Sequence, residues 1–136
     1  IRRPPRSTRK ESSAASDVYK RQDIIRLIAP TTSLDRAIKI SSQSSGYIYY
    51  ISVKGITGAS NIDADDVKNK VGVLQTFTDL PIAIGFGIKD AISASSVKDI
   101  ADGIVAGSVF VDLIGEGNDV LNRVAKKTKE LKEVLG

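Results

Sequence analysis

Short runs of apolar residues alternate along residues 23–136 with longer segments in which apolar and polar residues mix at helical spacing. The apolar runs cover residues 24–29, 47–53, 81–86 and 103–109. They are rich in Ile, Val and Tyr, which favour strands. The runs therefore predict four strands that are apolar throughout, as strands covered on both faces are.

A segment with the spacing of an amphipathic helix follows each run. Four residues that favour helix N-caps open these segments: Ser33, Asp63, Asp90 and Asp119. The residues expected to face inward are Leu34, Ala37 and Ile38 in the first helix, Val67, Val71 and Leu74 in the second, and Leu121, Val124, Leu131 and Leu135 in the last. The third helix is expected to run from Asp90 to about Ile100.

Alternating strands and helices predict a parallel sheet with crossover helices, an α/β fold. Two architectures fit four such βα units: a small doubly wound sheet and part of a (β/α)8 barrel. A complete barrel takes about 250 residues. Residues 23–136 would then supply about half of a barrel.

Residues 1–22 differ in composition from the rest of the chain. They hold seven basic and two acidic residues, a net charge of +5, whereas residues 23–136 have a net charge of −1. The segment has a Pro-Pro pair, scattered Ser and no apolar periodicity, so we expect it to be disordered. A nucleic-acid-binding tail and an organelle transit peptide are two interpretations. The string RRPPRST…SSAASDVYKRQ also resembles translated sequencing-adapter sequence, so we expect an artefact and assign the fold to residues 23–136.

The composition excludes several classes of site. Of the 136 residues, 41% are hydrophobic and 26% charged, as in soluble globular domains. The chain contains no Cys, His or Met, which excludes a disulfide framework, a Cys- or His-ligated metal and a Ser-His-Asp triad. It begins at Ile1, so we expect a fragment or a processed chain. No apolar run approaches the ~20 residues of a membrane span, and none resembles a secretory signal, so we expect a cytoplasmic protein.

Glycines gather where the predicted strands end. The third strand ends in Gly85-Phe86-Gly87, the fourth contains Gly107-Ser108, and the loop after the second holds Gly55 and Gly58. Glycine lets backbone N–H groups approach a phosphate closely, and helix N-termini favour anions. Phosphate-binding barrels use the loops after strands seven and eight and a short extra helix. The pattern fits such a site, with a short helix after Ser108, and it fits equally well glycines that serve only as turn residues at strand ends.

The tyrosines of the second strand divide between its faces, because successive strand residues point to opposite sides. Tyr47 and Tyr49 share one face, and Tyr50 takes the other with Ile48. Thr57 is by default a hydrogen-bonding turn residue. No Asp or Glu stands at the carboxyl end of a predicted strand. The residues thus offer a phosphate cradle with no evident acid or base.

Three motifs together are similar to the α subunit of tryptophan synthase: GYIYYISVKGITG at 46–58, PIAIGFGI at 81–88 and VAGSVFV at 105–111. LIAPTTS at 27–33 also fits that family's fifth strand and its outgoing loop. The resemblance covers residues 23–136. It implies strands five to eight, the C-terminal half of a phosphate-binding (β/α)8 TIM barrel.

The resemblance also implies a carbon–carbon lyase of tryptophan biosynthesis. The family cleaves indole-3-glycerol phosphate to indole and glyceraldehyde 3-phosphate in a retro-aldol reaction. Indole then passes to a β subunit, which joins it to serine, and the two kinds of subunit form a heterotetramer. Pyridoxal phosphate belongs to the β subunit. For this chain the resemblance implies no cofactor, metal, nucleic acid or membrane.

The matching positions can be named one by one. Gly58, Gly87, Gly107 and Ser108 match the family's phosphate-binding groups, chiefly through backbone N–H. The positions that match pocket residues are Tyr49, Thr57, Gly85 and Phe86. In the family the tyrosine lies beside the indole, and the threonine belongs to the mobile loop that closes the site.

The departure from the family concerns catalysis. The family's catalytic glutamate and aspartate come from the first half of the barrel, and neither has a counterpart here. We therefore expect that the parent protein is the enzyme and that this chain is inactive. The alternatives are a non-catalytic or other phosphate-binding half-barrel of amino-acid biosynthesis and a basic-armed nucleic-acid-binding domain.

Overall fold

The computed structural model describes residues 22–52, 63–85 and 87–136. Four parallel strands form one sheet in chain order: β1 (Arg26–Ile28), β2 (Ile48–Ile51), β3 (Ile82–Gly85) and β4 (Gly103–Val105). The helices of the described residues are α2 (Leu34–Ser42), α3 (Ala64–Gln75), α4 (Ala91–Ser95), α5 (Ser108–Gly115) and α6 (Val120–Leu135). The expectations for residues 1–21 lie outside the described residues.

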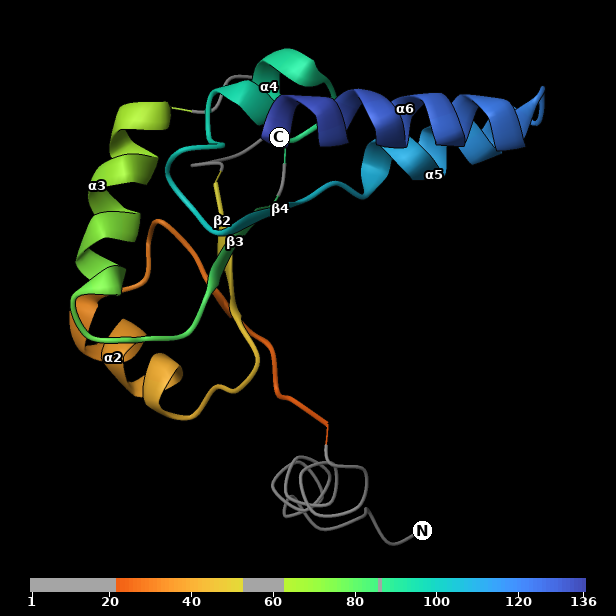
Figure 1. Ribbon diagram of the computed structural model, residues 1–136. Helices are drawn as coiled ribbons and strands as arrows, with labels where there is room; N and C mark the ends of the chain where they lie inside the picture. Colours follow the sequence, from red (N-terminus) through yellow and green to blue (C-terminus); the bar gives the residue numbers. More distant parts are fainter. Residues whose placement is uncertain (1–21, 53–62, 86) are drawn as a thin grey trace, which may run out of the picture.

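Two rows of residues cross the sheet and define its faces. Ile28, Tyr50, Ile84 and Ile104 lie in register, and all but Ile104 are fully buried. The neighbouring row is Leu27, Tyr49, Ala83 and Gly103, and Leu27 is 57% exposed. Figure 1 shows α2 and α3 together on one side of the sheet. The sheet therefore has a helix-covered face, which carries Tyr50, and an open face, which carries Tyr49 and is left uncovered by the described helices.

The core lies between the helix-covered face and the helices. Its buried side chains are Ile28, Ala37, Ile48, Tyr50, Val67, Val71, Leu74, Ile82, Ile84, Ile88, Ala94, Val97 and Leu131. The inward face predicted for α3 is confirmed, and the Asp63 carboxylate accepts the Asp66 N–H at 3.1 Å, as an N-cap does. The predicted division of the tyrosines is also confirmed, since Tyr50 is buried while Tyr47 and Tyr49 are partly exposed.

The fourth strand is shorter than predicted. It ends at Val105, not at residue 109, and α5 begins at Ser108. The apolar run continues through both elements, so composition does not mark where the strand ends and the helix begins. The short extra helix expected after Ser108 is confirmed as α5.

Helix α4 is also shorter than predicted, since it ends at Ser95 and turns follow to Ile100. Its start is as predicted, because Asp90 forms a capping box with Ser93. At this end the Ser96 hydroxyl donates to the Ser93 carbonyl at 2.8 Å. Such bonds compete with the helix ladder.

Two predicted inward faces are partly wrong. In α2 the buried residues are Ala37 and Ser41, while Leu34 and Ile38 are exposed. In α6 only Leu131 is buried, and Leu121 is 86% exposed. Helix α6 packs against α4 and α5. Contacts with two helices bury less of its apolar face than packing on a sheet would.

Two N-cap positions are occupied without the expected capping bond. Ser33 and Asp119 precede their helices as predicted, but neither side chain bonds to the helix backbone. The Asp119 carboxylate accepts instead from the Asn122 side chain at 2.8 Å. In the described part of the chain, no helix is long and apolar enough to cross a membrane.

Candidate functional site

The carboxyl ends of β2, β3 and β4 meet at one edge of the sheet, the carboxyl edge. Ile51, Gly85 and Val105 lie in register there. Gly87 stands two residues beyond Gly85, and Gly107 stands two residues beyond Val105. Neighbouring strands are about 4.8 Å apart. The two glycine-bearing loops therefore leave the sheet side by side.

The loop after β4 leads directly into α5. Gly107 is the N-cap residue, with φ −120° and ψ −67°, and Ser108 is the first helical residue. The first bonds of the helix run from the N–H groups of Phe110 and Val111 to the Gly107 carbonyl, at 3.0 and 3.2 Å. The N–H groups of Ser108 and Val109 precede these bonds. They lie where a helix N-terminus favours an anion.

The loop after β3 depends on a glycine conformation. Gly87 has φ 83°, in the left-handed region that residues with a Cβ rarely adopt. Gly87, Gly107 and Ser108 are all exposed. The structure thus places three of the four expected phosphate-binding residues on accessible backbone at the carboxyl edge. The fourth, Gly58, lies outside the described residues, as do Thr57 and Phe86.

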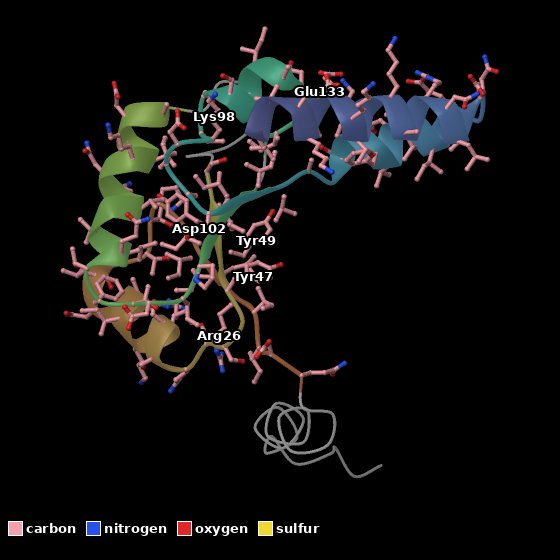
Figure 2. The ribbon with its side chains drawn as sticks, viewed as in Figure 1. Arg26, Tyr47, Tyr49, Lys98, Asp102 and Glu133 are labelled. Carbon is pink, nitrogen blue, oxygen red and sulfur yellow. The ribbon has the colours of Figure 1, made fainter. Side chains whose placement is uncertain are left out.

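Tyr49 lies against Gly85 on the open face. Figure 2 shows Tyr47 and Tyr49 on the side of the sheet away from α2 and α3. A Cβ on Gly85 would overlap the Oη and Cζ atoms of Tyr49 and lie 2.8 Å from its Cε2. The phenol ring therefore occupies the space that a side chain at position 85 would need. These two expected pocket residues are brought together by the structure.

Ser52 ties β2 to β3 at the same edge. Its N–H and its Oγ each donate to the Gly85 carbonyl at 3.0 Å, and the side chain is buried. These two hydrogen bonds hold Gly85 beside the strand that carries Tyr49. Sequence reasoning missed Ser52, although a polar residue at the end of an apolar run was a usable signal.

Two described carboxylates, Asp90 and Glu130, are occupied in bonds that hold helices together. The Asp90 carboxylate accepts the Ser93 N–H at 2.8 Å and the Ser93 hydroxyl at 2.7 Å, and these bonds lower the pKa of Asp90. Glu130 accepts from Lys127 Nζ at 2.7 Å and from the Ala91 N–H at 3.1 Å, which lowers the pKa of Glu130. Both groups are therefore ionised at neutral pH, and neither is suited to donate a proton there.

The arrangement as a whole can bind an anion beside an aromatic ring. Exposed backbone N–H groups and the α5 N-terminus stand next to the Tyr49–Gly85 pair across the β3–β4 contact. None of the carboxylates in the described ranges follows a strand within three residues. The described residues therefore supply binding groups to this edge and no carboxylate directly after a strand.

The match that identifies the family runs almost the whole length of the chain. The family model described as the tryptophan synthase alpha chain matches residues 6–135. The chain belongs to this family. The matched range begins inside the basic segment that sequence reasoning set apart from the fold.

Individual relatives agree with the family match. The tryptophan synthase alpha chain of Marinobacter nauticus is 49% identical over 92 residues, which are 68% of this chain and 34% of that protein. The alpha chain of Neisseria meningitidis serogroup B is 42% identical over 115 residues, 83% of this chain and 44% of that protein. This chain thus spans less than half the length of these curated relatives.

A solved structure shares the fold. The tryptophan synthase alpha subunit of Campylobacter jejuni superposes with a TM-score of 0.74 at 29% identity, over 93% of this chain and 51% of that one. The parallel sheet and its helices are therefore part of a (β/α)8 barrel of the tryptophan synthase alpha type, as the resemblance implies.

Proposed function

We propose that the carboxyl edge of this sheet binds the phosphate end of indole-3-glycerol phosphate, as part of a tryptophan synthase alpha barrel. One observation carries the proposal: the Gly87 loop and the N-terminus of α5 leave neighbouring strands from one register row. The backbone N–H groups of Gly87, Gly107 and Ser108 would hold the phosphate, together with Gly58. The positive end of the α5 dipole favours the anion.

The indole ring would lie on the open face beside Tyr49. This side chain is partly exposed and lies directly against Gly85, so a flat ring can stack on it next to the phosphate loops. We also propose Thr57 and Phe86 as pocket residues, because their positions match pocket residues of the family. Tyr49 binds the ring in this account and transfers no proton.

We propose further that these 136 residues alone do not cleave the substrate. The retro-aldol step needs one group to protonate the indole ring at C3 and another to deprotonate a substrate hydroxyl. The carboxylates of Asp90 and Glu130 have lowered pKa values and accept hydrogen bonds from helix residues. The two catalytic carboxylates would come from the other half of a complete barrel, in a carbon–carbon lyase of tryptophan biosynthesis.

The partner proposed for the complete barrel is a tryptophan synthase β subunit, which receives indole and holds pyridoxal phosphate. Solved relatives include structures of tryptophan synthase from Mycobacterium tuberculosis. A cytoplasmic location agrees with this role.

Phosphate binding can be tested at one glycine. A Cβ at Gly107 would meet nothing within 4 Å, and the residue has a negative φ, so Gly107→Ala leaves the fold intact. The added methyl stands where the phosphate must approach the backbone. We expect Gly107→Ala to weaken binding of indole-3-glycerol phosphate at least tenfold, measured by isothermal titration calorimetry.

Gly115→Ala is the matched control, because Gly115 ends the same helix and its Cβ would also meet nothing within 4 Å. This variant should bind as the original chain does. Equal affinity of the Gly107→Ala chain and the control would contradict the proposal.

A further inference from the structure

The sheet has two open edges. Its strands are parallel and follow chain order, so β1 forms one edge and β4 forms the other. No strand within residues 22–52, 63–85 and 87–136 pairs with the outer side of either. An unpaired strand edge presents backbone N–H and C=O groups to another chain. The described sheet can therefore add a parallel strand at each of its two ends.

Exposed apolar side chains gather beside these two edges. Helix α2 connects β1 to β2, and helices α5 and α6 follow β4. We call β1, α2, β4, α5 and α6 the edge elements. Within the described residues, they hold six of the nine large apolar side chains that are exposed: Leu27, Leu34, Ile38, Val111, Ile114 and Leu121. Helix α3, which connects the two central strands, instead buries Val67, Val71 and Leu74. The uncovered apolar surface thus follows the edges of the sheet.

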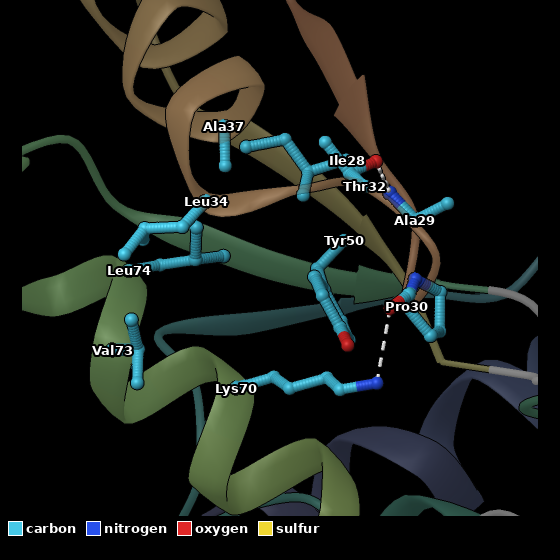
Figure 3. Close-up of a pocket in the computed structure, with 10 residues that line it drawn as sticks. All are labelled: Ile28, Ala29, Pro30, Thr32, Leu34, Ala37, Tyr50, Lys70, Val73 and Leu74. Carbon is cyan, nitrogen blue, oxygen red and sulfur yellow. Dashed lines mark hydrogen bonds between the residues drawn. The ribbon is translucent and has the colours of Figure 1, made fainter.

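The helix-covered face of the sheet is already filled. Figure 3 shows Ile28, Ala37 and Tyr50 between the sheet and helices α2 and α3, and all three are buried. On the open face, Leu27 is 57% exposed and Tyr49 is partly exposed. Figure 1 shows α5 and the adjoining part of α6 extending beyond the sheet, away from α2 and α3. A partner would therefore lie against the open face and the edge elements around it.

The two edges carry opposite charge. Residues 24–42, which include β1 and α2, hold three basic residues and one acidic residue, a net charge of +2. Residues 103–123, which include β4, α5 and the start of α6, hold three acidic residues and one basic residue, a net charge of −2. Opposite charges favour contact, and like charges oppose it. The charge pattern therefore favours contact of a β4 edge with a β1 edge, and opposes contact of either edge with its own copy.

We propose that a second copy of this chain covers the open face, and that the two copies close into an eight-stranded pseudo-barrel. A two-fold axis along the barrel places the β4 edge of each copy beside the β1 edge of the other. Both new strand pairs are then parallel, as the existing pairs are. Four strands from each copy give the eight at which side chains just fill a barrel interior. The proposal does not depend on phosphate binding at the carboxyl edge.

Sedimentation velocity of the full chain over a wide range of concentration tests the proposal. We expect a species of twice the mass of the chain, which dissociates to a monomer on dilution. Two variants place a charge on surfaces that the pseudo-barrel buries. Leu27→Lys does so on the open face, and Val111→Lys does so beside β4, at a position that is 68% exposed in the single chain. Each should weaken dimerisation at least about tenfold, because a buried charge without a partner is costly.

Ile92→Lys is the matched control for Val111→Lys. Ile92 is also β-branched and helical, and it is 82% exposed, but it belongs to α4, which is not an edge element. This variant should dimerise as the original chain does. If circular dichroism shows that a test variant does not fold, Leu27→Gln or Leu121→Lys takes its place, with weaker dimerisation again expected.

Three results would overturn the proposal. One is a monomer at every concentration, as follows if another segment of the chain covers these surfaces. The second is a series of species larger than a dimer, because edge contacts that do not close form open chains. The third is weakening by only one of the Leu27 and Val111 variants, since a dimer formed through one kind of edge needs only that edge.

Discussion

Replacing Gly85 with Ala tests the contact that shapes the proposed pocket. The new Cβ would overlap the Oη and Cζ of Tyr49, so the phenol ring must move. Overpacking of this kind costs about 1–3 kcal/mol. Because Tyr49 is partly exposed, its ring can rotate outward. We therefore expect a loss of stability in the lower part of that range, about 1–2 kcal/mol.

The assay is urea unfolding followed by far-UV circular dichroism. Gly103→Ala is the matched control, because Gly103 lies in the same register row as Tyr49 and its Cβ would meet nothing within 4 Å. That variant should be neutral or more stable by up to about 1 kcal/mol, since Ala restricts the unfolded chain.

A double-mutant cycle isolates the cause. In a Tyr49→Ala background the ring is gone, and Gly85→Ala should then cost less than about 0.5 kcal/mol. The reasoning is refuted if Gly85→Ala costs as little as Gly103→Ala. It is also refuted if the cost of Gly85→Ala is the same with and without the Tyr49 ring.

Three further predictions concern stability, each measured by urea unfolding. Tyr50→Phe removes an unpaired buried hydroxyl and should stabilise the chain by about 1 kcal/mol; a loss of stability would contradict the unpaired state. Asp90→Ala removes the capping box and should cost about 1 kcal/mol at pH 7. Because the folded-state pKa of Asp90 is lowered, its contribution is present at neutral pH and is lost as the pH falls below the ordinary carboxyl range and through that lowered pKa, so the variant should lose less stability on acidification than the original chain. Ile84→Ala should cost about 2–5 kcal/mol, while Ile92→Ala, at a position 82% exposed, should change stability by less than about 0.5 kcal/mol; similar costs would contradict the assigned core.

The features best predicted from sequence were those with one clear period. The alternation of strands and helices, the α3 face with Val67 and Val71, and the division of Tyr49 from Tyr50 follow from spacing alone. In each case the local pattern and the tertiary packing favour the same arrangement.

The remaining features depend on contacts between distant segments. The end of β4 was misplaced because the apolar run continues into α5 without a polar break. Leu121 was expected to be buried because it lies on the apolar face of its helix. It is exposed, since helical spacing does not show how much of that face the neighbouring helices cover. The contact of Tyr49 with Gly85 joins two strands, and no periodicity within either strand reveals it.

The central proposal is that the carboxyl edge of this chain binds the phosphate of indole-3-glycerol phosphate and that these 136 residues alone do not cleave it. One NMR sample tests both parts: the labelled chain is mixed with indole-3-glycerol phosphate, and amide and indole signals are followed together. We predict shifts at the amides of Gly87, Gly107 and Ser108, with indole staying at the level of a heat-killed control. Indole that accumulates above that control, or unshifted amides at these three residues, would contradict the account.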